Sequence, residues 1–587
     1  MRNKVLKKKG TVSKKNNANK KQSFMLGAAI LTVCLLIVKI IGMLYKVSLS
    51  RLYGPVGGGL LSNAYELYIP LFTLATAGFP IAVSRMVSES MSQGRYRDIR
   101  RIKKVAVPFF IVTGIIGFLL MILFSFFYVR YIKAPDAFIS TLALAPAIFF
   151  GCLVSAYRGY YEGMRNMLPT SISEIVEAFV KLAVGYSLAY LMMNYGESWF
   201  GITDENTLIK YSVAAAIFGI TLGSFFSFLY IYLRYKIKGD GITDEMYRLS
   251  PKPRSKNETF HILLRTAIPI GLGALVMNVA GTIDASLIQR RLLFMMDKNP
   301  ASLLNEYEGL IPQDVIDEGV VHTYLWGCYG YALTIMNLVV TVTQAFGTTA
   351  LPNVTEAFTK GNKAALKKSI ETVMRVTFVF TLPAGLGLTV LSEPIMRVVY
   401  GYTDGVGIAG EVLRVMGIAV IVFAAATPMC SMLQAVGRVD MPLKLYAIGM
   451  VIKIVSNYVL VGIPQINVQG GSLGTLFCYT FVIVVSVFVL IKETGIIPDF
   501  KVVLIKPLIA SVMCAVTAWV SYSLLSKVIV TESLKLLTVK VIISVAMACV
   551  MYAVFLLLLR AITKDDIISL PKGNKIVTVL EKYHLIG

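Results

Sequence analysis

Fourteen stretches of about 20 mainly apolar residues follow one another along this chain of 587 residues. About 20 such residues cross the hydrocarbon core of a bilayer when they form a helix, and a helix satisfies its own backbone hydrogen bonds there. The pattern therefore predicts an all-α polytopic membrane protein of about 14 transmembrane helices. The expected spans are 24–46, 62–83, 105–128, 138–157, 172–193, 211–233, 264–288, 324–350, 372–391, 409–432, 443–463, 471–491, 503–524 and 537–559.

Lysine and arginine are distributed unevenly over the loops between these spans. With the N-terminus in the cytoplasm, forty of the 57 basic residues fall on the cytoplasmic side and eleven outside. Because cytoplasmic loops carry the excess of Lys and Arg in membrane proteins, both termini are predicted to be cytoplasmic. The net charge of +24 is confined to loops and tails. It therefore reflects topology and contact with anionic lipid, and no nucleic-acid partner is expected.

The chain repeats itself at an offset of about 272 residues. The stretch "KLAVGYSL" at 181–188 aligns with "KIVSNYVL" at 453–460, and "RNMLP" at 165–169 aligns with "RVDMP" at 438–442. Parallel repeats of this kind build transporters whose substrate site lies between the halves. We expect a basic arm (1–23), an N-lobe of six spans (24–238), a basic linker (239–263), a C-lobe of six spans (264–492), two further helices (493–560) and a tail (561–587).

The first helix of each half carries charge into the membrane. The stretch "GMLYKVSLSR" at 42–51 resembles "GTIDASLIQR" at 281–290, which pairs Tyr45 with Asp284 and Arg51 with Arg290. Ionisable residues within spans usually face a bundle interior or a wet cavity. The cations expected to bind substrate in such a cavity are Lys39, Lys46, Arg51, Arg85, Arg265 and Arg290. The polar residues expected beside them, with ion coupling as a possible role, are Glu66, Glu174, Glu177, Lys181, Asp284 and Lys453.

A cavity weighted toward cations favours an anionic, phosphate-bearing cargo, since Arg and Lys bind phosphate well. Simpler interpretations stay open for several of these residues. Arg85 and Arg265 lie at span ends, where they would also serve as interfacial anchors. Glu177 and Lys181 are spaced to form an ion pair along one helix face. The glycines of "GPVGGG" at 54–59 favour a bend and close helix packing.

Motifs for enzyme chemistry are missing from the sequence. It contains no GxxxxGK[ST] nucleotide loop, no G-x-S-x-G and no H-E-x-x-H, and its three histidines are far apart. The seven cysteines lie in or beside apolar runs without a CxxC pair. We expect no enzyme activity, no cofactor and no metal site.

The stretch "SRLYGPVGGGLLSNAYELYIPLFTLATAGFPIAVSRMVSE" at 50–89 resembles the N-terminal signature of bacterial polysaccharide flippases of the MOP superfamily. Within that superfamily the stretch resembles the stage V sporulation protein B group, which is related to the lipid II flippase MurJ. The resemblance implies a flippase for undecaprenyl-pyrophosphate-linked sugars, most of all the peptidoglycan precursor lipid II, in the bacterial cytoplasmic membrane. It also implies a cationic cavity between two rocking lobes, and a groove on the last two helices for the polyprenyl tail.

By position, Lys39 stands where the MurJ branch has a cavity arginine, while "YGYALTIMN" at 329–337 lacks the arginine of that branch's eighth span. The resemblance further implies roles in cell-wall synthesis, cell shape or sporulation, and a monomer that contacts proteins of those processes. Three alternatives stay open: a flippase for another lipid-linked polysaccharide, a MATE-like cation-coupled multidrug antiporter, and a membrane scaffold without transport.

Overall fold

A computed structural model describes residues 24–76, 78–438, 440–529 and 533–561. The predicted basic arm at 1–23 and the tail from 562 onward lie outside the described residues. Within the described ranges the regular elements are helices, without a β-strand. The prediction of an all-α fold is therefore confirmed.

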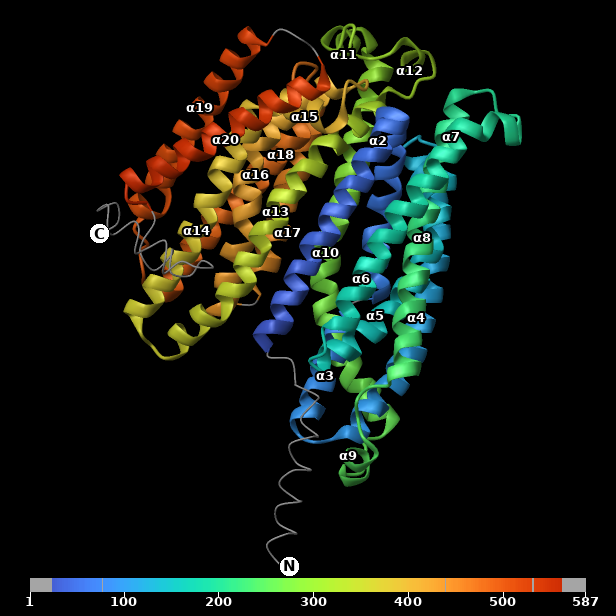
Figure 1. The fold of residues 1–587 in the computed structure, drawn as a ribbon, viewed down its shortest axis with the longest axis vertical. Coiled ribbons are helices and arrows are strands. Elements are labelled where there is room, and N and C mark those ends of the chain that lie inside the picture. Colours follow the sequence, from blue (N-terminus) through green and yellow to red (C-terminus); the bar gives the residue numbers. More distant parts are fainter. Residues whose placement is uncertain (1–23, 77, 439, 530–532, 562–587) are drawn as a thin grey trace, which may run out of the picture.

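The first half of the chain forms a series of long helices with one π-helical turn (Figure 1). Their bounds are α2 (Phe24–Thr76), α3 (Phe79–Ser92), α4 (Tyr96–Tyr131), α5 (Ala137–Gly163), α6 (Leu168–Val180), the π-helix η1 (Lys181–Gly185), α7 (Tyr186–Phe200), α8 (Glu205–Lys238) and the short α9 (Asp244–Leu249).

The second half repeats this plan and adds a helical pair. Its elements are α10 (Lys256–Lys298), α11 (Pro300–Glu306), α12 (Gln313–Asp317), α13 (Val321–Thr359), α14 (Lys363–Val390), α15 (Ser392–Tyr400), α16 (Val406–Ala435), α17 (Met441–Leu460), η2 (Asn467–Gln469), α18 (Gly470–Thr494), η3 (Lys501–Ile505), α19 (Lys506–Val528) and α20 (Leu534–Leu558).

Among the described residues, 12 helical segments are long and apolar enough to cross a membrane. The difference from fourteen has two causes. The segment Val33–Ser92 covers most of the first predicted span and the whole of the second, and α10, which contains the seventh, is not among the twelve. The chain is thus a multi-pass membrane protein.

The first two spans are one helix, α2, bent near its middle. The helical backbone is interrupted at Tyr53 and Gly54, where Gly54 has φ 64° and ψ −168°. This region of backbone space is open essentially to glycine alone. Pro55 then starts the second segment. The predicted bend at "GPVGGG" is confirmed.

Beyond the bend, the glycines of α2 allow α13 to approach closely. A Cβ atom on Gly59 would lie 2.9 Å from Cγ2 of Thr323, and one on Gly58 would lie 3.0 Å from the ring of Tyr331. The Tyr331 hydroxyl in turn donates a hydrogen bond to the Ser50 carbonyl at 3.2 Å. Small residues permit such backbone proximity between membrane helices, so the two halves of the chain meet tightly along α2 and α13.

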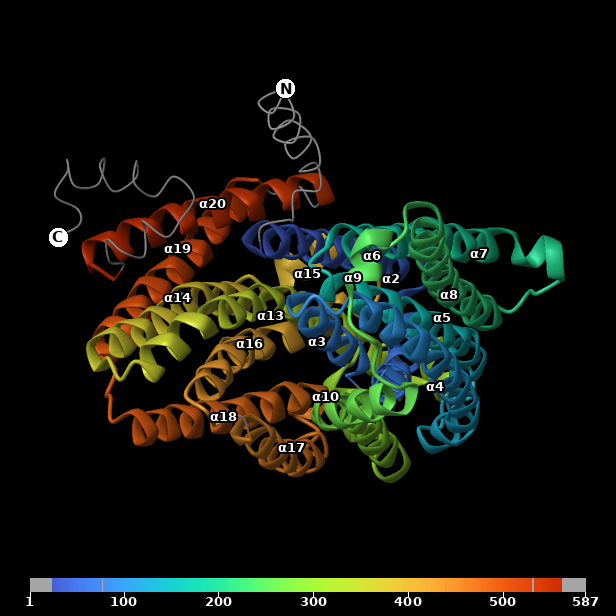
Figure 2. The same ribbon diagram turned by 90° about the horizontal axis from the view of Figure 1, so that it is seen from below.

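The helices form two groups that share α10. Helices α3–α8 lie on one side of α2 and α10, and α13–α20 lie on the other (Figure 1). Seen from below, α19 and α20 lie beside α14, far from α4 and α8 (Figure 2). Helix α10 joins both groups, since Leu263 and Ala267 belong to the apolar core of the first and Ala285 and Ile288 to that of the second.

Loop contacts join segments that the charge distribution assigns to the same side. Arg100 pairs with Asp240 at 3.1 Å at the end that carries α9, where both were expected to be cytoplasmic. At the opposite end, which carries α11 and α12, Lys210 pairs with Asp136 at 2.9 Å (Figure 1). The end with α11 and α12 is called the α11–α12 end below.

Candidate functional site: a line of charged residues between the two halves

Charged and tyrosine side chains from α2, α6–η1, α10 and α17 meet where the two halves of the chain adjoin. We call this set the polar line. It runs from the first half to the second and consists of Lys181, Tyr45, Lys46, Tyr65, Glu66, Asp284 and Lys453.

At the first-half end of the polar line, two lysines lie over aromatic rings. The Nζ atom of Lys181 is 4.7 Å from the ring centroid of Tyr45 and 5.0 Å from that of Tyr65, and Nζ of Lys46 is 5.3 Å from the Tyr65 ring. The Tyr45 hydroxyl donates to the Ala216 carbonyl at 2.8 Å, which fixes the ring. Each cation–π contact contributes about 0.5–2 kcal/mol, and so offsets only part of the cost of burying a lysine.

The π-helix η1 begins at Lys181 and lies against α8. Gly185 and Gly219 touch there backbone to backbone, since a Cβ on Gly219 would lie 2.6 Å from the Gly185 nitrogen. Such π-turns are rare and often occur at functional sites. The turn changes the register of the helix directly after Lys181.

At the second-half end, Asp284 of α10 and Lys453 of α17 form an ion pair. Both side chains are largely buried, with 12% and 15% of their surface exposed. Asn457, one helical turn beyond Lys453, donates from Nδ2 to Asp284 Oδ1 at 3.0 Å. The carboxylate is thus neutralised and held in place.

Glu66 lies between these two ends. It interacts electrostatically with Lys46 on one side and with Asp284 and Lys453 on the other. Its carboxylate lies against Gly281, where a Cβ atom would collide with it, and its carbonyl accepts a hydrogen bond from the Thr282 hydroxyl. The polar line is therefore continuous across the boundary between α2 and α10.

A pair of amides secures the same boundary nearby. The Asn63 side chain donates to Gln289 Oε1 at 3.1 Å, and the Gln289 side chain donates to Asn63 Oδ1 at 2.7 Å. Both residues are fully buried. Such reciprocal satisfaction removes the cost of burying two polar groups.

Cations exceed carboxylates in this region. Lys39 is exposed on α2 and lies close enough to Lys181 and Lys46 for like-charge interaction. Together with Lys453 they make four cations beside the carboxylates of Glu66 and Asp284, while Glu177, which also interacts with Lys181, is paired with Arg158. Lys46 and Lys181 form no ion pair with a carboxylate in the described part of the chain. Excess positive charge in a membrane protein's interior calls for an anion.

The other predicted cations lie elsewhere. Arg51 donates from Nε and Nη2 to the carbonyls of Val399 and Val398, both at 2.9 Å, at the end of α15. Arg290 lies over the ring of Tyr131 at 5.0 Å, in a groove between α4, α10 and α17. Arg85 and Arg265 are exposed on α3 and near the start of α10. These four are not part of the polar line.

Glu174 and Glu177 belong to a second polar cluster, inside the first half. Arg158 pairs with Glu177 at 2.8 Å and donates to Ser173 at 2.9 Å, while Ser224 donates to Glu177 Oε1 at 3.1 Å. Glu174 accepts a hydrogen bond from the thiol of Cys34. The ion pair that the spacing of Glu177 and Lys181 favours is therefore replaced by one with Arg158.

Three residues of these two clusters were not among the predicted site residues: Arg158, Tyr65 and Asn457. Arg158 lies in a segment that was predicted to be a cytoplasmic loop, and Tyr65 carries no charge that would single it out. Asn457 had a usable signal, because it follows Lys453 by four residues and so lies on the same helix face. In the described residues no group of three or more His, Cys, Asp or Glu side chains is arranged to hold a metal ion.

The arrangement of helices is that of MOP superfamily transporters. An inward-facing multidrug resistance MATE family transporter of that superfamily matches with a TM-score of 0.59 at 14% identity, over 80% of this chain and 99% of that one. A structure of the lipid II flippase MurJ in an inward closed conformation matches with a TM-score of 0.56 at 14% identity, over 90% of this chain and 99% of that one. At such identities the likeness shows the fold.

Sequence comparisons point to one group of proteins within that superfamily. Residues 24–293 match the family described as polysaccharide biosynthesis protein, and residues 315–541 match the family described as lipid II flippase MurJ. The lipid II flippase MurJ of Bacillus subtilis (strain 168) is 24% identical over 84% of this chain and 86% of its own length. The stage V sporulation protein B of the same organism is 22% identical over 95% of this chain and 99% of its own length.

Over most of its length the chain is therefore similar to polysaccharide flippases of the MOP superfamily, including MurJ and stage V sporulation protein B. These relatives and structural neighbours are flippases and transporters, so the chain is a transport protein and not an enzyme.

Proposed function

We propose that this protein is a flippase that moves undecaprenyl-pyrophosphate-linked sugars across the cytoplasmic membrane, with lipid II as the foremost substrate. The observation that carries the proposal is the excess of cations on the polar line. Lys46 and Lys181 have aromatic faces as partners but no paired carboxylate, so an anionic group entering between the halves would complete their charge balance.

A pyrophosphate suits such a site for physical reasons. Its oxygens accept several charge-assisted hydrogen bonds at once, and lysine ammonium groups act as mobile point charges for phosphate. Lys39, exposed near Lys181, would make the first contact. Arg51, Arg85, Arg265 and Arg290 lie outside the polar line and would act, if at all, as the substrate enters or leaves.

The mechanism we propose is alternating access of the two lobes, 24–238 and 264–492, with the termini in the cytoplasm and α19–α20 beside the path of the lipid tail. In the described conformation α2 and α13 are tightly packed. Separation of these two helices would expose the polar line toward the α11–α12 end. The protein would work as a monomer that contacts membrane lipids and proteins of cell-wall synthesis or sporulation.

The test uses the purified full-length chain in liposomes with a fluorescent lipid II analogue. We expect Lys46→Gln, Lys181→Gln and Lys39→Ala each to slow translocation by about tenfold, as expected for losing one charge-assisted contact of about 1.4 kcal/mol. Lys46→Arg keeps the charge and should retain most activity. The matched control is Lys133→Gln, a surface lysine of the α4–α5 loop that pairs with Asp297. Unchanged rates in all three neutral variants would contradict the proposal.

A second candidate is a cation-coupled multidrug antiporter, favoured by the MATE-like fold, by the buried carboxylate of Asp284 and by the half-buried one of Glu66. The same liposomes distinguish the two functions. An antiporter would move a cationic dye against a sodium or proton gradient and lose that activity in Glu66→Gln, whereas the flippase would move the lipid II analogue in either direction down its gradient.

A further inference from the structure

A second polar cavity lies at the α11–α12 end, away from the polar line. It has a volume of about 470 Å³, is open on one side and is lined mainly by residues of α15, α16, α19 and α20. None of its residues belongs to the polar line. It is lined by Val390, Ser392, Glu393, Pro394, Arg397, Tyr402, Arg414, Trp519, Tyr522, Ser523, Ser526, Leu537 and Lys540.

The cavity is positively charged, with three cations and one carboxylate. Glu393 is already engaged, since Arg397 Nη2 donates to its Oε1 at 2.6 Å. That leaves Lys540 and Arg414, neither of which has an ion pair or a side-chain hydrogen bond among the described residues. The Ser526 hydroxyl is buried there beside Tyr522. Two unpaired cations and a hydroxyl donor together define a site for an oxyanion.

Lys540 is the most informative of these residues. Its surface is only 7% exposed, although it belongs to α20, a helix whose other residues are almost all apolar. A lysine that is buried without a carboxylate partner usually marks a functional site. A bound anion would neutralise its charge.

The position of the cavity selects the kind of anion. Lys540 lies six residues into α20, about 9 Å along the helix, which is near the depth of lipid headgroups. Trp519, at the cavity wall, is 59% exposed, and the outer faces of α19 and α20 present apolar side chains such as Val516 and Ile542. A lipid whose chains lie on this face can place its headgroup in the cavity from the side.

We propose that this cavity binds the phosphate group of a membrane lipid in the leaflet at the α11–α12 end. Arg414 and Lys540 bind the phosphate oxygens and Ser526 donates a hydrogen bond to them. The volume lies within the range of about 300–1,000 Å³ typical of ligand sites, so a diacylglycerol phosphate headgroup fits. This site does not depend on which lipid the protein translocates.

The experiment measures lipid binding to the full-length protein in detergent by native mass spectrometry. The probes are phosphatidylglycerol, a monoglucosyl-diacylglycerol without phosphate, and inorganic phosphate. Lys540→Gln and Arg414→Gln are each expected to weaken phosphatidylglycerol binding by about tenfold, the loss expected for one charge-assisted contact. Because Arg414 is exposed, Arg414→Gln is expected to fold even if Lys540→Gln does not, so the proposal can still be tested.

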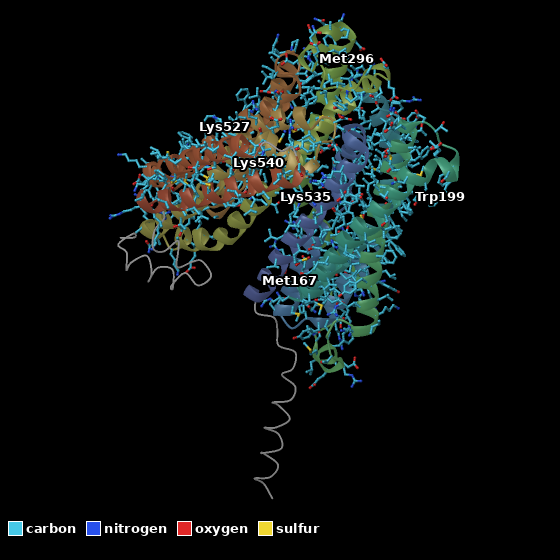
Figure 3. All side chains as sticks on the ribbon, turned by 45° about the horizontal axis from the view of Figure 1, so that its top comes forward. Met167, Trp199, Met296, Lys527, Lys535 and Lys540 are labelled. Carbon is cyan, nitrogen blue, oxygen red and sulfur yellow. The ribbon has the colours of Figure 1, made fainter. Side chains whose placement is uncertain are left out.

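The controls are Lys535→Gln and Lys527→Gln, which remove the same charge from α20 and α19 at exposed positions outside the cavity (Figure 3). They should bind phosphatidylglycerol as the native protein does. If inorganic phosphate competes with the lipid in the native protein and not in Lys540→Gln, phosphate is the group recognised. Equal binding of the glycolipid, or equal losses in the cavity and control variants, would overturn the proposal. No transport is measured, so the outcome is independent of the flippase assay.

Discussion

Lys453 and Asp284 form a buried ion pair between α17 and α10. In the register of the internal repeat these residues correspond to Lys181 and Tyr45, which also meet, with Nζ of Lys181 4.7 Å from the tyrosine ring. The same two positions are therefore in contact in both halves, but with different chemistry. One lysine is neutralised by a carboxylate, and the other keeps its charge beside an aromatic ring.

The first prediction concerns the neutralised pair. Asp284→Asn leaves Lys453 buried and charged without its partner, so we expect a loss of about 3–5 kcal/mol in the free energy of unfolding. A fall in the melting temperature of the purified protein would report this loss. Adding Lys453→Gln removes the unpaired charge and should recover most of the stability.

Asp297→Asn is the matched control, because Asp297 pairs with Lys133 at the surface, where 65% and 55% of the side chains are exposed. Exposed pairs of this kind contribute about 0–1 kcal/mol. Equal effects of Asp284→Asn and Asp297→Asn would mean that the buried pair contributes no more than a surface pair.

The second prediction tests whether α2 and α13 separate during transport. A Cβ atom on Gly330 would lie 3.9 Å from Cβ of Ser62, within the range of about 3.5–4.5 Å found in disulfides. Ser62→Cys with Gly330→Cys should therefore crosslink on oxidation. We expect translocation to stop in the oxidised protein and to resume after reduction.

Background thiols are easily controlled in this experiment. Six of the seven native cysteines are buried and Cys549 is exposed, so the double variant is made with Cys549→Ser. Gly330→Cys alone shows the effect of the substitution without the crosslink. Full transport by the oxidised double variant would show that substrate passes without separation of α2 and α13 at this level.

The third prediction concerns the support of Lys181. Gly219→Ala would place a Cβ atom 2.6 Å from the Gly185 nitrogen, so α8 must move away from η1. Overpacking of this kind costs about 1–3 kcal/mol, and the shift displaces Lys181, four residues before Gly185. We expect a lower melting temperature together with slower translocation.

Gly387→Ala in α14 is the control, because nothing lies within 4 Å of the added Cβ. Alanine favours helix by up to about 1 kcal/mol over glycine, so this variant should be as stable as the native protein or slightly more stable. If both glycine variants behave alike, the contact between α8 and η1 does not position Lys181.

The fold was accessible from sequence because each membrane span is encoded locally. About 20 apolar residues are enough to predict a helix, and each of the fourteen predicted stretches falls mainly within helices of the described residues. The merging of two spans into α2 was partly visible too, since Gly54 and Pro55 marked the bend. The full length of α10 could not be predicted, because polar helix ends lack an apolar signal. This helix extends eight residues before its predicted span and ten beyond it.

The candidate site was accessible only in part, because it depends on which side chains meet. The repeat makes Lys181 equivalent to Lys453 and Tyr45 equivalent to Asp284, and in the structure Lys181 contacts Tyr45 as Lys453 contacts Asp284. Helix periodicity favoured an ion pair of Glu177 with Lys181, but Arg158 of α5 takes Glu177 instead. Such competition between partners from distant helices depends on tertiary packing and leaves no trace in local spacing.

Helix α10 has a mechanical consequence for the whole protein. Its Leu263 and Ala267 pack in one core and its Ala285 and Ile288 in the other, so one continuous helix joins the two lobes whose rotation we propose. In such a rotation α10 would have to bend between Ala267 and Ala285. Gly271 lies there, and a residue without a side chain lowers the local stiffness of a helix. Bending of α10 costs energy. This helix would therefore oppose rotation of the two lobes away from the conformation described here.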